Sequence, residues 1–592
     1  MSTPVAEASP VQKQAVRRVP LTFDENGDPK FDSVTSPECF KMHALGVMPP
    51  KHVIPVIFVP GIMGTNLCAN GKAQKKGTPA WIPPNGALAG LGEWRRRKKQ
   101  TPTERQQQLT PDHVEVDPSQ KVALPKGLYT LTEEEARRRG WGEVHFDSYG
   151  GILAELELAL NDQYIDAGTG NAKEMQVWTT AKTLKDAAGK DVLKEWNPVI
   201  GDVPPLTDGE LKRLADYYYP VWACGYNWLG SNEDSSDLLE KRINEAIEWY
   251  KKGKYWVSTE QVIVVTHSMG GLVGRRAAQK GAIQILGVVH GVQPVGGAPV
   301  VYRRFRAGTE TGGIFDLMGS IVATIIGWDA ADITCLMANS AGPLELLPTK
   351  HYPAGWLRFE QERAGKRSPV TTALPVVSAG DGTNVEKDGV ADPYTQIYNK
   401  TAQQVWWGMV DETLIDPANL AEKNGTTAVE MYSNAITTAM RFHDALKLYC
   451  HPVTYAYFGS DDKQIAFSNV SWVTRAVVPS EAAGNIPTLT STSSTKLGST
   501  TLTIGSQTVT FSLANRDKPE SDSDPSSGDG TVPGPSGALI SEGSGKMTVF
   551  RMKGFDHQHS YGDHVVQGNV LYCISKIVQG AQMVAELPDC KE

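Results

Sequence analysis

The first half of the chain alternates continuous apolar runs with helix-compatible stretches. The apolar runs are rich in Val and Ile and lack polar alternation, which is typical of strands buried on both faces of a parallel sheet. Helix-compatible stretches follow two of the runs, at residues 235–251 and 272–280. The predicted strands cover residues 53–59, 219–224, 261–266 and 283–290.

This order of strands and helices predicts a three-layer α/β architecture, with a mostly parallel central sheet and helices on both faces. Strands of the sheet are expected to resume at residues 374–377 and at residues 453–458. Residues 301–445 interrupt this pattern and are rich in Trp, Tyr and apolar helical segments. A long insertion of this kind is expected to form a cap over an active site.

The same pattern divides the chain into four parts. Two insertions enlarge the core: a basic one at about residues 70–147, and a Ser/Thr-rich one at about residues 481–527. Within the second insertion, the alternating residues 501–512 predict an exposed hairpin strand. The four parts are an N-terminal extension (residues 1–50), the first part of the core (51–300), the cap or lid (301–445) and the second part of the core (446–592).

Charge and cysteine usage exclude several classes of protein. The 592 residues hold 58 Lys and Arg against 66 Asp and Glu, and this net charge of −8 argues against a general nucleic-acid binder. The seven cysteines lack the paired spacing of a structural zinc site. Asp522, Asp524 and Asp529 lack a complete calcium ligand set. We therefore expect no metal and no cofactor.

Neither a signal peptide nor a membrane span is predicted. The N-terminus has no unbroken apolar stretch, and no window reaches the roughly 18 uncharged apolar residues that a span requires. The chain is therefore expected to be made and folded in the cytoplasm. The longest apolar stretch is residues 314–328, and within it residues 314–326 predict either a lid helix that opens onto lipid or part of the core of the cap.

Three groups of basic residues are candidates for contact with anionic headgroups or phosphate. Residues 95–99 and residues 137–139 lie in the basic insertion, where a solvated loop explains them as well. Arg303, Arg304 and Arg306 lie beside the predicted cap.

Ser268 has the sequence context of a nucleophile. It follows the predicted strand 261–266 and precedes a helix-compatible stretch, as does the serine on the sharp strand-to-helix turn of α/β hydrolases. Gly270 and Gly271 occupy positions where a side chain would collide with the strained backbone. Thr266 departs from the GxSxG pattern, which has Gly there. The α/β class is thus specified further as an α/β-hydrolase fold with a large cap inserted in its core.

Two backbone N–H groups are candidates for an oxyanion hole. Acyl transfer requires donors for the developing oxyanion, and in this fold one of them comes from the loop after an early strand. Residues 60–64 (PGIMG) form such a loop, so the N–H groups of Ile62 and Met269 are the predicted pair. A plain glycine turn is the alternative interpretation.

The acid and the base should follow the serine in that order. Asp529 lies in the glycine-flanked loop 528–533, and His557, in the DHQHS segment 556–560, comes 28 residues later. We favour Asp529 as the acid and His557 as the general base. Asp381 is a rival acid in the predicted cap, His559 is the alternative base, and the remaining candidates are Asp461 and Asp462 as acids and His564 as a solvated or helix-start residue.

Four ordered motifs resemble those of the lecithin–cholesterol acyltransferase and lysosomal phospholipase A2 family. Residues 59–67 (VPGIMGTNL) are similar to its VPGxxGxxL element, and residues 225–228 (GYNW) to its YDW element, with Asn in place of Asp. Residues 267–271 and 528–532 match its serine and acid motifs.

Three other segments look more like bacterial relatives of the GPI inositol-deacylase type, which include antibacterial lipase effectors of type VI secretion. These segments are residues 294–299, 345–348 and 556–561. The resemblance implies a serine lipase or phospholipase that acts at a membrane surface on phospholipid or another lipid ester. It also implies injection into the periplasm of a rival cell, an immunity protein and contact with a component of the secretion apparatus. The alternative is a neutral-lipid or short-chain carboxylesterase with no toxin role.

Overall fold

The central feature of the computed structural model is a seven-stranded sheet in the order β12-β27-β20-β17-β16-β6-β14. All neighbouring strands are parallel except β12, which pairs antiparallel with β27 at one edge. The structure describes residues 15–32, 42–85, 99–162, 164–166, 172–281, 284–309, 327, 329–377 and 390–582. The strands are β6 (Val56–Val59), β12 (Pro198–Ile200), β14 (Val221–Ala223), β16 (Val262–His267), β17 (Ile285–Gly291), β20 (Val453–Gly459) and β27 (Lys546–Met552).

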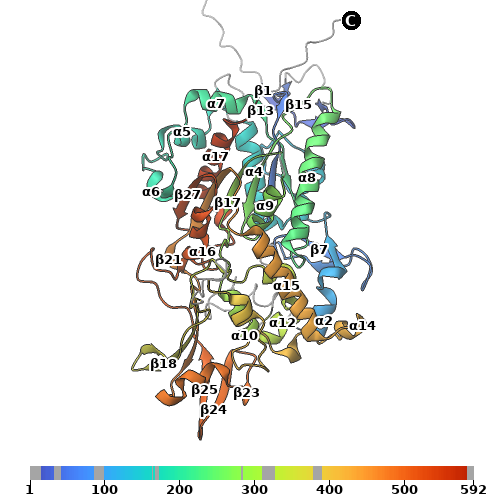
Figure 1. Ribbon diagram of the computed structural model, residues 1–592. Helices are drawn as coiled ribbons and strands as arrows, with labels where there is room; N and C mark the ends of the chain where they lie inside the picture. The colour runs from blue at the N-terminus through green and yellow to red at the C-terminus, as the bar shows by residue number, and fades with distance from the viewer. Residues whose placement is uncertain are drawn as a thin grey trace, which may run out of the picture.

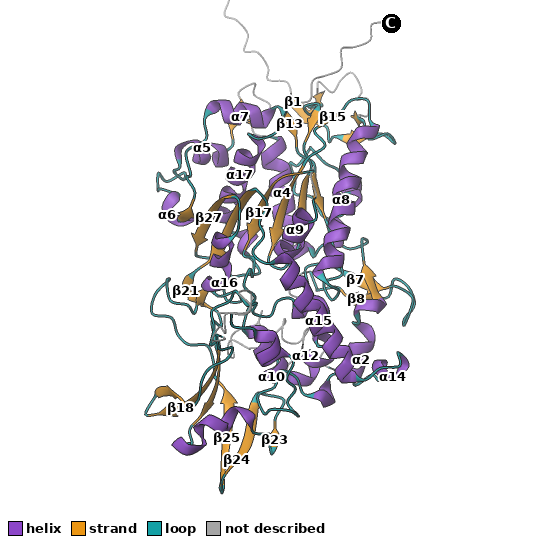
Figure 2. Ribbon diagram, in the orientation of Figure 1, coloured by secondary structure: helices purple, strands orange, loops and turns teal. Residues whose placement is uncertain are grey.

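Alternate residues of the central strands enter two separate hydrophobic cores. In β16, Val262 and Val264 belong to one core, whereas Ile263 and Val265 belong to the other. Because successive side chains of a strand point to opposite faces, both faces of the sheet must be covered, which explains the continuous apolar runs. Helices α8 (Asn232–Lys252) and α9 (Gly270–Gln279) cover one face, and α4 (Phe146–Asn161) and α17 (His564–Val578) cover the other (Figure 2).

Most of the predicted core elements are confirmed. The four early runs contain β6, β14, β16 and β17, and residues 453–458 lie in β20. The run at residues 53–59 is interrupted before Val56, so that His52–Val53 (β5) pairs with other short strands, β13 (Tyr217–Tyr218) and β15 (Val257–Ser258). The prediction of a central strand at residues 374–377 is wrong. Leu374 instead makes an isolated bridge to Leu357, outside the central sheet.

A second sheet of six strands, in the order β19-β18-β22-β25-β24-β23, lies at one end of the molecule, away from the central sheet (Figure 1). Strands β24 and β25 form a hairpin, so the predicted single hairpin strand at residues 501–512 is in fact two strands. In this sheet, β22 lies between the strands of the predicted cap and the strands of the Ser/Thr-rich region and pairs with one of each. Its strands are β18 (Leu357–Arg363), β19 (Lys366–Pro369), β22 (Val470–Thr474), β23 (Ser493–Ser494), β24 (Ser499–Ile504) and β25 (Gln507–Leu513).

Helices between the two sheets complete the cap. Figure 1 shows α10 and α12 between the second sheet and the core, with α15 running alongside. No helix among the described residues is long and apolar enough to cross a membrane. The predicted lid segment, residues 314–326, lies outside the described residues. The helices are α10 (Val300–Ala307), α12 (Ala330–Met337), α13 (Ala341–Leu344), α14 (Leu420–Lys423) and α15 (Ala428–Leu446).

Two of the arginines considered for headgroup contact are buried. Arg139 is fully buried and pairs with Glu135 and Glu157. Arg306 donates to the backbone carbonyls of Trp406 and Gly408. These two side chains therefore hold the fold together rather than facing a lipid surface. Residues 95–98 lie outside the described residues.

Candidate active site

The predicted site residues meet at the carboxyl edge of the central sheet. Ser268 follows β16, the turn at residues 60–64 follows β6, and His557 lies in the loop after β27. Asp529 follows β26 (Ser527–Gly528), which pairs with β21 (Asp461–Ile465) directly after β20. The ends of β6 and β16, and those of β20 and β27 on the other side of β17, therefore contribute to one site, which is where α/β sheets bind ligands.

Ser268 lies on a strained turn between β16 and α9. Its φ of 52° is in the left-handed region, which a residue with a side chain rarely adopts. A Cβ on Gly270 would approach Val59 O to 2.6 Å, and a Cβ on Gly271 would lie 2.6 Å from Gln293. The two glycines thus let α9 pack against its neighbours directly after the turn. Thr266 fits in place of the usual Gly because its methyl group lies against Gly274, where a Cβ would come within 3.0 Å of it.

His557 bridges the serine and the acid. Its Nδ1 lies 2.8 Å from Asp529 Oδ2, and its Nε2 lies 2.8 Å from Ser268 Oγ. Because a carboxylate only accepts, Nδ1 carries the proton, and Nε2 is free to accept from the serine hydroxyl. This chain of contacts has the geometry by which a histidine removes the proton of a serine nucleophile.

Asp529 is held in place by backbone donors. Its side chain is 1% exposed, and its Oδ1 accepts the N–H groups of Thr531 at 3.0 Å and Val532 at 2.7 Å. A Cβ on Gly459, at the end of β20, would come within 2.7 Å of Asp529 Cβ. The acid therefore fits against the end of this strand only because a glycine is there.

The rival residues are engaged elsewhere. His559 is paired with Asp556 and its side chain is 54% exposed, so His557 and not His559 contacts Ser268. Asp461 accepts the N–H groups of Lys463 and Gly554, and His564 begins α17. Asp381 lies outside the described residues.

The turn after β6 lies directly against the serine. A Cβ on Gly61 would lie 2.9 Å from Ser268 Cβ, and the Gly64 N–H donates to Gly61 O at 3.1 Å. Among the hydrogen bonds between described residues, neither Ile62 N–H nor Met269 N–H has an acceptor. The N–H groups of both predicted oxyanion donors are therefore not committed to another described residue.

His267 connects three parts of the site, although no pattern in the sequence indicates such a role. Its Nδ1 lies 3.0 Å from the Tyr149 hydroxyl, and its Nε2 lies 2.8 Å from the backbone carbonyl of His557. The Tyr149 oxygen accepts the Gly61 N–H at 3.1 Å. Burial, together with the neighbouring His557, lowers the pKa of His267 to about 3.

One carboxylate cluster lies close to the site. The carboxylates of Asp461, Asp462 and Asp522 have ligand atoms within 4.8 Å of one another. Lys553 Nζ already lies 2.9 Å from Asp522, and this contact lowers the pKa of the carboxyl. The cluster is thus partly neutralised by a lysine and by backbone N–H groups.

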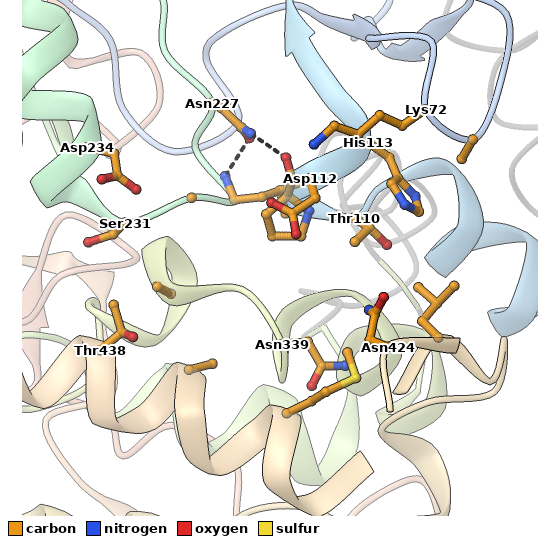
Figure 3. A pocket seen from close by; sticks show the side chains of 18 of the residues that line it. Lys72, Thr110, Asp112, His113, Asn227, Ser231, Asp234, Asn339, Asn424 and Thr438 are labelled. Atoms are coloured by element: carbon orange, nitrogen blue, oxygen red, sulfur yellow. Dashed lines mark hydrogen bonds between the residues drawn. The ribbon is translucent and has the colours of Figure 1, made fainter. Parts of the chain in front are cut away.

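A separate cavity of about 1200 Å³ lies between the core and the cap. It is lined by the start of α8, the loop that holds Asn227, and the cap helices α14 and α15, and Ser268, Asp529 and His557 do not contribute to it. Figure 3 shows amide, hydroxyl and charged side chains facing this space, with Asn227 anchored by two hydrogen bonds. The cavity is a polar cleft at the boundary of the cap.

The fold defines the class to which the protein belongs. A mostly parallel sheet covered on both faces, with Ser268 on a strained turn after a central strand, is the α/β-hydrolase fold.

Comparison with solved structures then identifies the family. A chain of the crystal structure of the Tle4–Tli4 complex matches with a TM-score of 0.70 and 30% sequence identity, over 90% of this chain and 99% of that chain. At this identity and coverage, the protein belongs to the same family as the matched chain, the Tle4 family. No protein-family model and no curated protein matches the sequence.

Proposed function

We propose that the protein is a serine lipase that hydrolyses acyl ester bonds of membrane phospholipids through Ser268, His557 and Asp529. The observation that carries this proposal is the pair of 2.8 Å contacts that joins the serine to the histidine and the histidine to the acid. The strained turn at Ser268 and the nearby unoccupied N–H groups of Ile62 and Met269 support it.

In the acylation step, Ser268 Oγ attacks the carbonyl carbon of the ester while His557 Nε2 takes the hydroxyl proton. The carbonyl oxygen becomes an oxyanion, to which the N–H groups of Ile62 and Met269 donate. Asp529 stabilises the imidazolium and keeps Nδ1 protonated. His557 then gives its proton to the alcohol oxygen of the glycerol as the ester bond breaks. The product is an acyl-serine.

In the deacylation step, His557 takes a proton from water, and the resulting hydroxide attacks the acyl-serine. The second oxyanion uses the same two N–H donors. The tetrahedral intermediate collapses to a free fatty acid, and Ser268 regains its proton from His557. The cycle consumes one water and requires no cofactor.

We further propose that the protein is an antibacterial effector, delivered by type VI secretion into the periplasm of a target cell. Membership of the family of Tle4 supports this role. The matched structure is a Tle4–Tli4 complex, so a cognate immunity protein is the expected partner here too. A secretion-apparatus component is expected to carry the protein to the target.

Exchange of the nucleophile tests the enzymatic proposal directly. We expect Ser268→Ala to abolish fatty-acid release from phospholipid vesicles, a loss of about 10⁴-fold or more in kcat, because no attacking oxygen remains. The variant should keep the Tm of the wild type, since Ala removes only the hydroxyl. The measurement is fatty-acid titration, together with fluorophosphonate labelling of the wild-type serine.

Three measurements would contradict parts of this proposal. Retained hydrolysis by Ser268→Ala would refute the assignment of the nucleophile. Faster hydrolysis of triacylglycerol or short-chain p-nitrophenyl esters than of phospholipid would instead favour the carboxylesterase alternative. Expression directed to the periplasm should kill a bacterial host while cytoplasmic expression should not, and equal survival would contradict the effector role.

A further inference from the structure

His267 lies directly beside the proposed nucleophile but has no part in the reaction proposed above. Its side chain is 2% exposed and contacts two segments that are distant in the sequence, α4 and the loop after β27. We propose that His267 is a positioning residue that fixes the backbone of His557 and links it to the oxyanion turn. This inference rests on the proposed function, whose site it describes in more detail.

The backbone of His557 is held on both sides. Its N–H donates to the carbonyl of Asp529 at 2.7 Å, and its carbonyl accepts from His267 Nε2 at 2.8 Å. The loop after β27 has no regular structure at residues 553–559, so these two bonds take the place of a sheet or helix ladder. They determine where the His557 ring can lie between Ser268 and Asp529. A displacement of about 1 Å at such a ring costs roughly 100-fold in rate.

The hydrogen-bond partners determine the tautomer of His267. The carbonyl of His557 can only accept, so His267 Nε2 must carry a proton. The Gly61 N–H donates to the Tyr149 oxygen at 3.1 Å, which leaves the Tyr149 hydroxyl proton to donate to His267 Nδ1. Each donor and acceptor in this series of hydrogen bonds, from Gly61 to His557, is then used once, and the His267 ring is neutral.

The same series of hydrogen bonds orients the turn at residues 60–64, which holds the predicted oxyanion donor Ile62. The Gly61 N–H is engaged by Tyr149, whereas the next N–H along the turn, that of Ile62, has no acceptor among the described residues. A Cβ on Gly61 would lie 2.8 Å from His267 Nδ1, so the turn and the ring are in direct contact. His267 therefore connects the donor that would hold the oxyanion with the residue that would move the proton.

Neutrality of His267 suits a site in which His557 becomes cationic. The ring centroids of the two histidines are 5.2 Å apart, so a second positive charge at His267 would oppose formation of the imidazolium. Burial lowers the pKa of His267 to about 3, so its ring stays neutral near pH 7. The titratable groups around His267 are Tyr149, Asp556, His557, His559 and Tyr561.

Two substitutions separate the two bonds of His267. In His267→Gln the side-chain amide nitrogen lies near the original Nε2 and can still donate to the carbonyl of His557. In His267→Asn the shorter side chain places its polar atoms near the original Nδ1, so it keeps the link to Tyr149 and loses the link to His557. Both replacements are neutral amides of similar polarity, which makes each the control for the other.

We expect His267→Asn to lower kcat about 10- to 100-fold with KM within about 2-fold of wild type, and His267→Gln to retain kcat within about 5-fold. Hydrogen exchange of the peptide that covers residues 553–562 should be faster in His267→Asn than in His267→Gln, and this readout requires no activity. Equal kcat values and equal exchange in the two variants would overturn the positioning role. If the wild type neither hydrolyses lipid nor reacts with a fluorophosphonate, the proposed function fails, while hydrogen exchange still decides the role of His267.

Discussion

Two buried carboxyl groups, Asp529 at the edge of the sheet and Glu345 at the junction of cap and core, have different surroundings. Asp529 accepts two backbone N–H groups and the ring N–H of His557. Glu345 accepts the Ser231 hydroxyl at 2.7 Å and the Asn232 N–H at 2.8 Å, at the start of α8. No cationic side chain pairs with Glu345 among the residues that the structure describes.

The two carboxyl groups therefore have different proposed tasks. Asp529 would orient His557, whereas Glu345 joins two parts of the chain. In the proposed reaction, Asp529 faces a histidine that becomes an imidazolium, so its negative charge would stabilise that state. Glu345 is fully buried, and burial raises its pKa to about 8. Below that pH it is a neutral acid that fastens the end of α13 to the start of α8. Burial by itself therefore does not indicate a catalytic acid.

The largest expected effect in this comparison comes from Asp529→Asn. An amide has no negative charge to stabilise the imidazolium and favours the wrong tautomer of His557, so kcat should fall about 10³- to 10⁴-fold. Steady-state hydrolysis of phospholipid vesicles measures it. Asp556→Asn is the matched control, since the ion-pair partner of Asp556 is the exposed His559, and a comparable loss in the control would count against Asp529 as the acid.

The next effect concerns Glu345→Gln and the free energy of unfolding. The carboxyl of an unfolded chain titrates near pH 4.3 and that of the folded protein at about 8, so the unfolded state loses its proton first as the pH rises. The stabilisation of the folded state by protonated Glu345 is therefore fully present below about pH 4. As the pH rises from there to about 8, the free energy of unfolding falls by at most about 1.4 kcal/mol per pH unit. The Gln variant, which cannot titrate, should gain stability relative to wild type over this window.

Denaturant unfolding at pH 5, 6.5 and 8 measures the difference between the two proteins. Parallel stability curves for wild type and Glu345→Gln would show that Glu345 titrates alike in the folded and unfolded states. The activity per folded molecule at pH 6.5 should be the same in both, because Glu345 does not contact the proposed triad.

The smallest effect is expected for His559→Ala. Its ring is more than half exposed and pairs with Asp556 on the surface, an interaction worth at most about 1 kcal/mol. Its kcat should stay within about 2-fold of wild type, whereas His557→Ala should match the loss seen in Ser268→Ala. A severe loss in His559→Ala alone would reverse the choice between the two histidines.

Local patterns predict the core and the nucleophile turn, because a strand buried on both faces and a glycine-flanked serine leave signals within about ten residues. The order of an acid and a histidine after the serine favours Asp529 and His557, which the structure brings to Ser268, but it leaves Asp381 and His559 open as alternatives. Tyr149 carries no such signal, since it reaches His267 across 118 positions. Arg139 resembles a residue of a solvated loop or a lipid contact because its acidic partner Glu157 is 18 residues away on another helix.

The second sheet has a consequence for how this protein can be divided. Its strands come from residues 357–369 and 493–513, joined by β22, and the chain returns between them to form β20 in the middle of the central sheet. The second sheet is therefore not one continuous segment of chain. Recombination at a single pair of sites could not transfer it alone to another hydrolase. Strand β20 pairs with two core strands, β17 and β27. Strands β18 and β22, which precede and follow it in the chain, pair with each other in the second sheet. Any exchange of the second sheet as one continuous segment would therefore carry β20, a strand of the core, with it.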